Sequence, residues 1–231
     1  MKAKDFKQLS LNQLRGKYGS VLLALFLAML VTGAVSAIVN IPSTLSDTPL
    51  IDSAGGLNLS QLPVFVPLGV IGGIILLAVS GAISYGVSKY MLTFVRQGSA
   101  DLGYIFCGFS NGFGTFLRTF VLALLMDIFV FLWSLLFIIP GIIASYRYAL
   151  AYYIMADDDS ISAIDAIRKS TQMMIGHKWK LFCLQLSFIG WYVLCTITCG
   201  IGFIFLAPYL DAATTNFYEY LRGISEGSKA A

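Results

Sequence analysis

Long apolar runs that contain no charged residue are the feature that most constrains this chain. Four of them are long enough to cross about 30 Å of hydrocarbon as helices, since a helix rises about 1.5 Å per residue. They are Ser20 to Val39, Leu62 to Val87, Leu181 to Thr198, and Gly200 to Leu210 and beyond. Of the 231 residues, 58% are hydrophobic and 12% are charged, which is more apolar surface than a soluble core of this size can hide from water. The chain is therefore predicted to be an integral membrane protein.

Two further runs bring the predicted number of spans to six. The run from Thr119 to Ile139 contains a single charge, Asp127, and the run that follows Pro140-Gly141 as far as Ala156 contains only Arg147. The predicted fold is an all-α membrane protein with six transmembrane helices arranged as three helical hairpins. A short interfacial amphipathic helix is expected before each hairpin.

Positive charges predict the orientation, because lysine and arginine near span ends are retained on the cytoplasmic side. Lysines and arginines collect in every second connection between the predicted spans. The other connections are residues 40–61, Pro140-Gly141 and the surroundings of Cys199-Gly200, and they contain no lysine or arginine. Both termini are therefore expected in the cytoplasm. A secretory signal that ends at Val35-Ser36-Ala37 is the rival interpretation of the first span. We favour a retained span, because its apolar run is longer than a usual signal core and takes part in an internal repeat.

The internal repeat predicts where each hairpin begins and returns. Each copy has a short amphipathic stretch, a glycine followed closely by an aromatic residue, an apolar hairpin, and a tyrosine in the returning span. The glycine and aromatic pairs are Gly16 and Tyr18, Gly114 and Phe116, and Gly176 and Trp179; the tyrosines are Tyr85, Tyr146 and Tyr209. Chance recurrence at membrane boundaries is the alternative explanation.

A single membrane domain, 1–231, follows from this repeat. Its predicted segments are an N-terminal interfacial helix (1–17), hairpin one (18–88, with an outer loop 40–61), an interfacial segment (89–118), hairpin two (119–156), a cytoplasmic amphipathic helix (157–180), hairpin three (181–222) and a tail (223–231).

Two amphipathic segments predict contact with the membrane surface or with the bundle itself. In the first, Phe6, Leu9 and Leu14 share one side and lysines surround them, which suits anionic lipid headgroups rather than nucleic acid. The second, 161–175, has isoleucines at helical spacing, a Ser162 and Asp165 capping box, and Gly176 as a C-terminal stop. Before it stand three aspartates, 157–159. We favour a solvated helix cap over a calcium site, because no EF-hand spacing follows.

Ionisable residues at membrane depth are costly and must face protein or water, so Asp127, Arg147 and Asp211 form the candidate intramembrane polar site together with Pro208. If the repeat holds, Arg147 and Asp211 lie at nearly the same depth, and we expect them to form a pair. Such a pair could be structural, or it could line an ion or substrate pathway. Pro208 cannot donate a backbone hydrogen bond, so it leaves the carbonyl of Ile204 without its helical partner.

Catalytic and metal-binding patterns are not found in the sequence. His177 is the only histidine, and the four cysteines do not have a zinc spacing. No glycine-rich phosphate loop or nucleophile elbow occurs. We therefore expect no cofactor, no metal site and no enzymatic activity.

The second half of the chain carries motifs that are similar to a known family. They include Ile139-Pro140-Gly141-Ile142-Ile143, Ser145-Tyr146-Arg147-Tyr148, Gly176-His177-Lys178-Trp179-Lys180, Pro208-Tyr209 and Asn216-Phe217-Tyr218. These runs resemble the bacterial integral-membrane family catalogued as domain of unknown function nine-seven-five. The resemblance implies a multi-span protein of the bacterial inner membrane, and it implies no activity.

Three functions are open at this stage. The favoured one is a non-enzymatic membrane protein that engages anionic lipid, and also a membrane-protein partner or a second copy of itself. A small-solute or ion transporter with its polar site at Asp127, Arg147 and Asp211 is the first alternative. A lipid-modifying membrane enzyme that uses Asp127 is the second.

Overall fold

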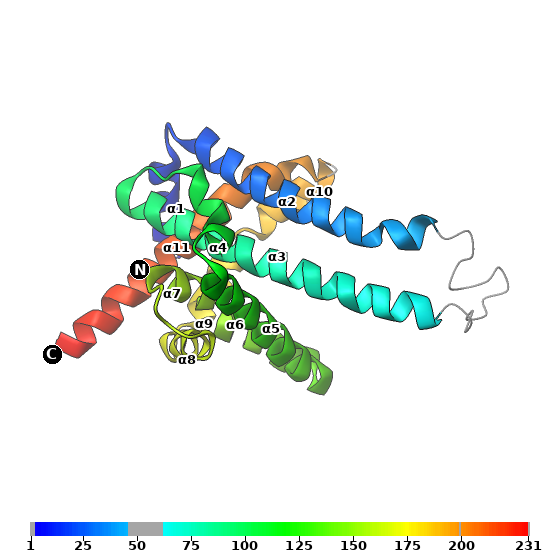
Figure 1. Cartoon of the computed structure of the whole chain (residues 1–231). Coiled ribbons are helices and arrows are strands. Elements are labelled where there is room, and N and C mark those ends of the chain that lie inside the picture. Colours follow the sequence, from blue (N-terminus) through cyan, green and yellow to red (C-terminus); the bar gives the residue numbers. More distant parts are fainter. Residues whose placement is uncertain (1–2, 46–61, 199, 231) are drawn as a thin grey trace.

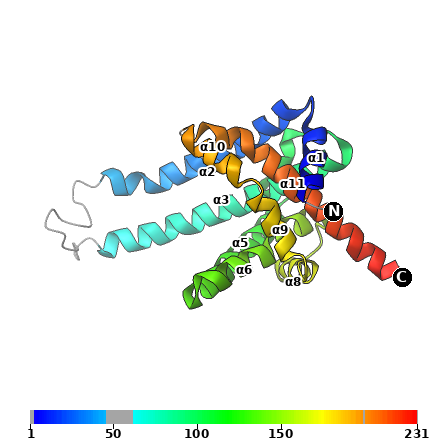
Figure 2. The same ribbon diagram turned by 180° about the vertical axis from the view of Figure 1, so that it is seen from behind.

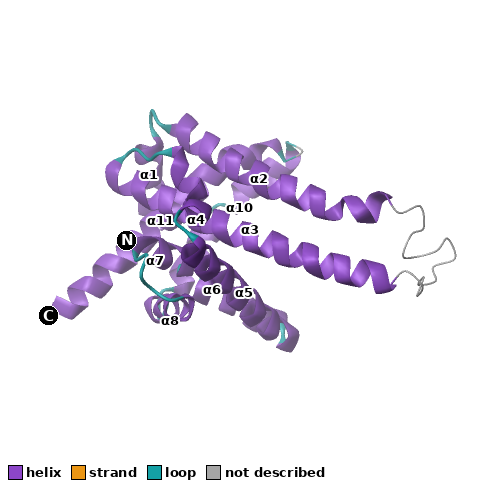
Figure 3. Ribbon diagram, in the orientation of Figure 1, coloured by secondary structure: helices purple, strands orange, loops and turns teal. Residues whose placement is uncertain are grey.

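The computed structural model describes residues 3–45, 62–198 and 200–230, and its regular elements over these ranges are all helical (Figure 1, Figure 3). The elements are α1 (Ala3–Leu14), α2 (Tyr18–Leu45), α3 (Leu62–Gln97), η2 (Leu102–Phe106), α4 (Cys107–Ser110), α5 (Phe113–Leu136), α6 (Ile138–Tyr148), α7 (Ala151–Asp157), α8 (Ala163–Met173), α9 (Lys178–Leu186), α10 (Ile189–Ile197) and α11 (Ile201–Ala230). The all-α prediction is confirmed for these residues. Most of the predicted outer loop, 46–61, lies outside them.

Four helical stretches in the described part are long and apolar enough to cross a membrane. They are Tyr18–Val39, Val70–Gln97, Phe113–Leu135 and Lys178–Ile197. The other two predicted spans fall short for different reasons. Helix α6 has 11 residues, about 17 Å at the usual rise, and a break separates it from α7. Helix α11 is long enough, but its second half is polar.

Pairs of helices diverge from a shared base (Figure 1, Figure 2). Helices α2 and α3 lie side by side and extend away from the base, while α5 and α6 extend in a different direction. Helices α9 and α10 lead from α8 toward α2, and α11 returns to the base beside α1. The base contains α1, η2, α4, α7 and α8.

The core lies where the returning helices α3, α7 and α11 meet. Tyr85 of α3, Ile154 of α7 and Phe217 of α11 are fully or almost fully buried. The rings of Tyr153 and Tyr218 stack with their centroids 5.7 Å apart. By contrast, α2, α5 and α10 expose many large apolar side chains, as expected of helices surrounded by lipid rather than water.

Two glycines allow α3 to approach the η2–α4 segment closely. A Cβ atom at Gly86 would overlap the carbonyl of Ile105, and one at Gly108 would overlap the carbonyl of Ala82. Where α2 and α3 approach, a Cβ at Gly72 would overlap the side chain of Val39, whereas one at Gly73 would meet open space. Close packing at this contact therefore depends on Gly72.

Three glycines with positive φ stand one or two residues before the start of α2, α5 and α9. They are Gly16 at +80°, Gly112 at +94° and Gly176 at +74°. Glycine adopts this conformation without the steric cost that other residues incur. Gly114, assigned to the repeat from the sequence, lies inside α5 instead. The second copy of the pattern is therefore better matched by Gly112.

Candidate functional site

The four residues of the predicted intramembrane polar site do not come together. Asp127 is exposed on α5, Arg147 is the penultimate residue of α6, and Pro208 and Asp211 lie on α11. None of the ion pairs among the described residues joins Arg147 to Asp211. The buried Nε of Arg147 has no hydrogen-bond partner. The pair expected between Arg147 and Asp211 is therefore not formed.

The packing of the helices explains why Arg147 and Asp211, which were expected at nearly the same depth, are not neighbours. Helix α6 packs against α5, α8 and α9. Asp211 instead lines a cavity of about 580 Å³ between α2 and α11. The predicted repeat concerns only the level of a residue along its own helices, so it could not indicate which helices would pack beside it.

A second hollow, which we call the crevice, lies between α10 and α11 near the N-terminal end of α2. Its volume is about 340 Å³. Its lining is almost entirely apolar and comprises Leu11, Tyr18, Trp191, Leu194, Cys195, Thr198, Gly202, Phe205, Leu206 and Tyr209. The hydroxyl of Tyr18 donates a hydrogen bond to the carbonyl of Phe205 and so ties α2 to α11. Trp191 and Leu194 are about half exposed, so the crevice is open toward the apolar surroundings of the protein.

Helix α1 is held at one end of this crevice by contacts with α11. The ring of Phe6 packs edge-on against Phe217 and Tyr220 at 5.6 and 5.5 Å. The side-chain amide of Asn216 donates to Ser10 Oγ at 3.1 Å and to Gln13 Oε1 at 2.7 Å. The apolar side of α1 therefore packs on the bundle. Of the three residues predicted to share that side, Phe6 and Leu14 are buried and Leu9 is exposed.

Two basic residues stand near the crevice end of α1. Lys7 and Leu11 are four residues apart in α1, which places them in line along the helix, and Arg15 follows its last residue, Leu14, in the turn to α2. The ammonium group of Lys7 donates to the carbonyl of Ser187 at 2.5 Å and lies 4.1 Å from the centre of the Phe188 ring. Arg15 is exposed. An exposed guanidinium therefore follows the end of α1, four residues after Leu11, which lines the crevice.

Two of the three aspartates at 157–159 form ion pairs with other helices, whereas Asp158 stays exposed, as expected of a solvated cap. Asp157 pairs with Arg96 at 2.7 Å and with Arg222 at 3.2 Å, and it accepts a hydrogen bond from the Tyr218 hydroxyl at 3.0 Å. Arg96 also pairs with Glu219 at 2.7 Å. The ends of α3 and α7 are thus joined to the C-terminal half of α11 through one carboxylate.

Asp159 and Asp158 have separate partners. Asp159 pairs with Lys89 at 2.6 Å and accepts from the Tyr85 hydroxyl at 2.5 Å. Partial burial of Asp159 acts to raise its pKa, but the hydrogen bonds from Lys89 and Tyr85 outweigh that effect, so the pKa lies below its usual value. Asp158 accepts from the backbone and hydroxyl of Ser160. The three carboxylates therefore do not converge on one point.

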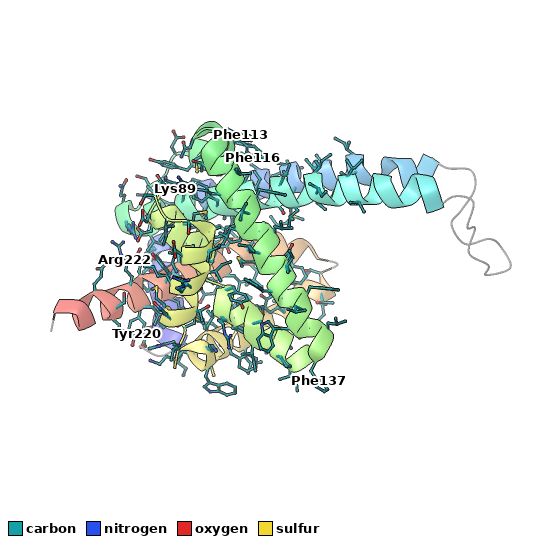
Figure 4. The ribbon with its side chains drawn as sticks, turned by 60° about the horizontal axis from the view of Figure 1, so that its bottom comes forward. Lys89, Phe113, Phe116, Phe137, Tyr220 and Arg222 are labelled. Atoms are coloured by element: carbon teal, nitrogen blue, oxygen red, sulfur yellow. The ribbon has the colours of Figure 1, made fainter. Side chains whose placement is uncertain are left out.

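Figure 4 shows how these charges are distributed relative to the second hairpin. Lys89 and Arg222 lie toward the same side of the molecule, whereas Phe137 lies at the far end of α5. Lys89, Arg96 and Arg222 are among the basic residues near the predicted span ends, which the sequence indicates only as markers of orientation. Their partners lie 70, 61 and 65 residues away, and no local spacing identifies partners at such separations.

Comparison with known proteins gives the family. No curated protein and no solved structure matches the chain. The model of a family described as a protein of unknown function (DUF975) matches residues 1–144 and 135–225. These ranges cover the N-terminal helix, every described hairpin and the motifs that carry the resemblance noted above. The chain belongs to the DUF975 family.

Proposed function

We propose that this protein is a non-enzymatic bacterial inner-membrane protein that binds an anionic lipid at the crevice beside α1. The observation that carries the proposal is that an apolar crevice lined by Leu11 of α1 lies beside two basic residues, Lys7 in α1 and Arg15 directly after it. A lipid with one acyl chain in the crevice and its phosphate near Arg15 would satisfy both features.

The lining of the crevice suits an acyl chain better than a polar solute. Among the described residues that line the crevice none is charged, so a polar ligand would lose its hydration without gaining polar contacts in exchange. An anionic headgroup at the rim would gain about 1 kcal/mol for each basic residue near the membrane surface. Lys7 is already bonded to Ser187, which makes Arg15 the residue expected to confer headgroup preference.

The proposal includes six spans with both termini in the cytoplasm. Helices α6 and α7 together would supply the fourth span, and the first half of α11 would supply the sixth. The absence of lysine and arginine from residues 40–61, together with their abundance in α1 and at the end of α3, supports this orientation. In this orientation, the Asp157 cluster, which consists of Asp157 with Arg96 and Arg222, faces the cytoplasmic leaflet. The end of the crevice near α1 faces the same leaflet.

Quenching of Trp191 by brominated lipid tests the proposal. A Trp133→Phe, Trp179→Phe protein leaves Trp191 as the reporter in the crevice. In phosphatidylcholine vesicles, brominated phosphatidylglycerol should quench it at several-fold lower mole fraction than brominated phosphatidylcholine does. Arg15→Gln should reduce that preference about fivefold, the factor that corresponds to about 1 kcal/mol.

Two controls make the result specific. Arg168→Gln removes an exposed arginine on α8, far along the chain from α1, and should leave the preference at Trp191 unchanged. A protein that keeps only Trp133, on α5, should show no headgroup preference. Equal quenching of Trp191 by both lipids, or a preference that persists in Arg15→Gln, would contradict the proposal.

A further inference from the structure

We propose that the cavity between α2 and α11 binds a lipophilic organic cation, with Asp211 as its counter-charge. This cavity is separate from the crevice. The α11 residues that line it are Phe203, Ile204, Ala207, Leu210 and Asp211, whereas those that line the crevice are Gly202, Phe205, Leu206 and Tyr209. The two sets lie on different sides of α11, so this inference does not depend on lipid binding.

One side of α11 carries both Asp211 and the residue whose carbonyl Pro208 leaves without its helical donor. Ile204, Ala207 and Asp211 stand at positions i, i+3 and i+7, which share a helical side. Pro208 has no N–H, so it cannot donate to the carbonyl of Ile204 four residues before it. Ile204 and Asp211 both line the cavity. A carboxylate and a carbonyl that lacks its helical donor therefore occur within two turns.

The carboxylate of Asp211 has no counter-charge among the described residues. The ion pairs in the described ranges involve other acids. Its backbone carbonyl accepts from Thr215 at 2.7 Å, but no described side chain donates to its carboxylate. A carboxylate in an apolar, half-buried position is costly unless a cation or a proton accompanies it.

The remainder of the cavity is apolar and partly aromatic. Helix α2 contributes Leu25, Phe26 and Met29, and α11 contributes Phe203. Phenylalanine rings attract organic cations through their electron-rich faces. The volume of about 580 Å³ lies within the range of small-molecule sites. Phe26, Met29 and Phe203 are each about half exposed, so a ligand would enter from the hydrocarbon and must itself dissolve there.

A metal ion fits this site poorly. Calcium and magnesium ions take six or more oxygen ligands, and Asp211 is the one acidic residue among the described residues that line the cavity. A bulky cation with apolar substituents needs only one counter-charge and a large apolar lining. The charge, the lining and the route of entry therefore all favour an amine or quaternary cation of low polarity.

Binding of tetraphenylphosphonium tests the inference, because tetraphenylborate provides an anion of the same shape. Equilibrium binding to the full-length protein in neutral-lipid nanodiscs, with empty nanodiscs subtracted, should detect the phosphonium but not the borate. Asp211→Asn should weaken phosphonium binding tenfold or more, since it removes the only formal charge in the lining. Asp127→Asn, which neutralises an exposed carboxylate on α5, should leave it unchanged.

A second variant covers the case in which Asp211→Asn does not fold. Ala207→Phe keeps the carboxylate but fills the cavity, and it should abolish phosphonium binding while the protein elutes as a single species. Equal binding of the phosphonium and the borate would show a non-selective apolar hollow and would overturn the proposal. So would unchanged phosphonium affinity in Asp211→Asn or in Ala207→Phe.

Discussion

Asp157 is the residue on which the base of the molecule most depends. It bonds to Arg96, Arg222 and Tyr218, and its side chain is only 15% exposed. We expect Asp157→Asn to lower the free energy of unfolding by about 1–3 kcal/mol, because two arginines would lose a shared, largely buried partner. Thermal unfolding in detergent would measure the change as a lower midpoint.

The matched control for Asp157 is Glu226, which pairs with the same Arg222 at 2.8 Å but is 62% exposed. Exposed ion pairs contribute little, so Glu226→Gln should change stability by no more than about 0.5 kcal/mol. If both variants lowered the midpoint equally, the burial of Asp157 would not be the reason for its effect.

Local features of single residues could be predicted from the sequence. Ser162 caps α8 by accepting from the backbone of Asp165, and Gly176 adopts the left-handed conformation after it. Both predictions are confirmed because their partners are close in sequence. The Asp157 contacts could not be predicted, since Arg96 and Arg222 lie in other hairpins and their choice of partner depends on how those hairpins pack.

At the scale of elements, the positive-φ glycines that precede α2, α5 and α9 allow a direct test of how these helices begin. Gly112→Ala should destabilise the protein by about 1–2 kcal/mol, because alanine is disfavoured at a φ of +94°. Gly114→Ala should be neutral or stabilising, since Gly114 is helical and has open space around it. Thermal unfolding midpoints of the two variants should be lower for Gly112→Ala than for Gly114→Ala. A lower midpoint for Gly114→Ala would instead favour Gly114 as the glycine of the predicted repeat.

The amphipathic helices show how far an element can be predicted. The boundaries of α8, Ala163–Met173, fall within the predicted 161–175. Its buried side was less well predicted, because Ala163, Ala166 and Ser170 are buried while Ile164 is 59% exposed. The hydroxyl of Ser170 donates to the carbonyl of Arg147 at 2.9 Å. Small residues allow that close approach, and an isoleucine can be exposed where the surroundings are apolar.

At the scale of the whole molecule, composition predicted a membrane protein and left the arrangement of the hairpins open. Apolar runs of sufficient length identify α2, α3 and α5, because length and hydropathy are local properties. The divergence of α5–α6 from α2–α3 (Figure 1) depends on the glycine contacts of α3 with η2 and α4, and on the Asp157 cluster. Both bring together residues that are distant in the sequence.

The orientation of the chain is the claim on which the lipid site and the cytoplasmic cluster both depend. Labelling with a membrane-impermeant maleimide tests it, in a protein whose four cysteines are replaced by serine. A Thr44→Cys thiol should react in intact cells, and a Gly227→Cys thiol should react only in inverted vesicles. Reaction of Thr44→Cys from the cytoplasmic side alone would place α1 and its basic residues outside the cell and would contradict the account.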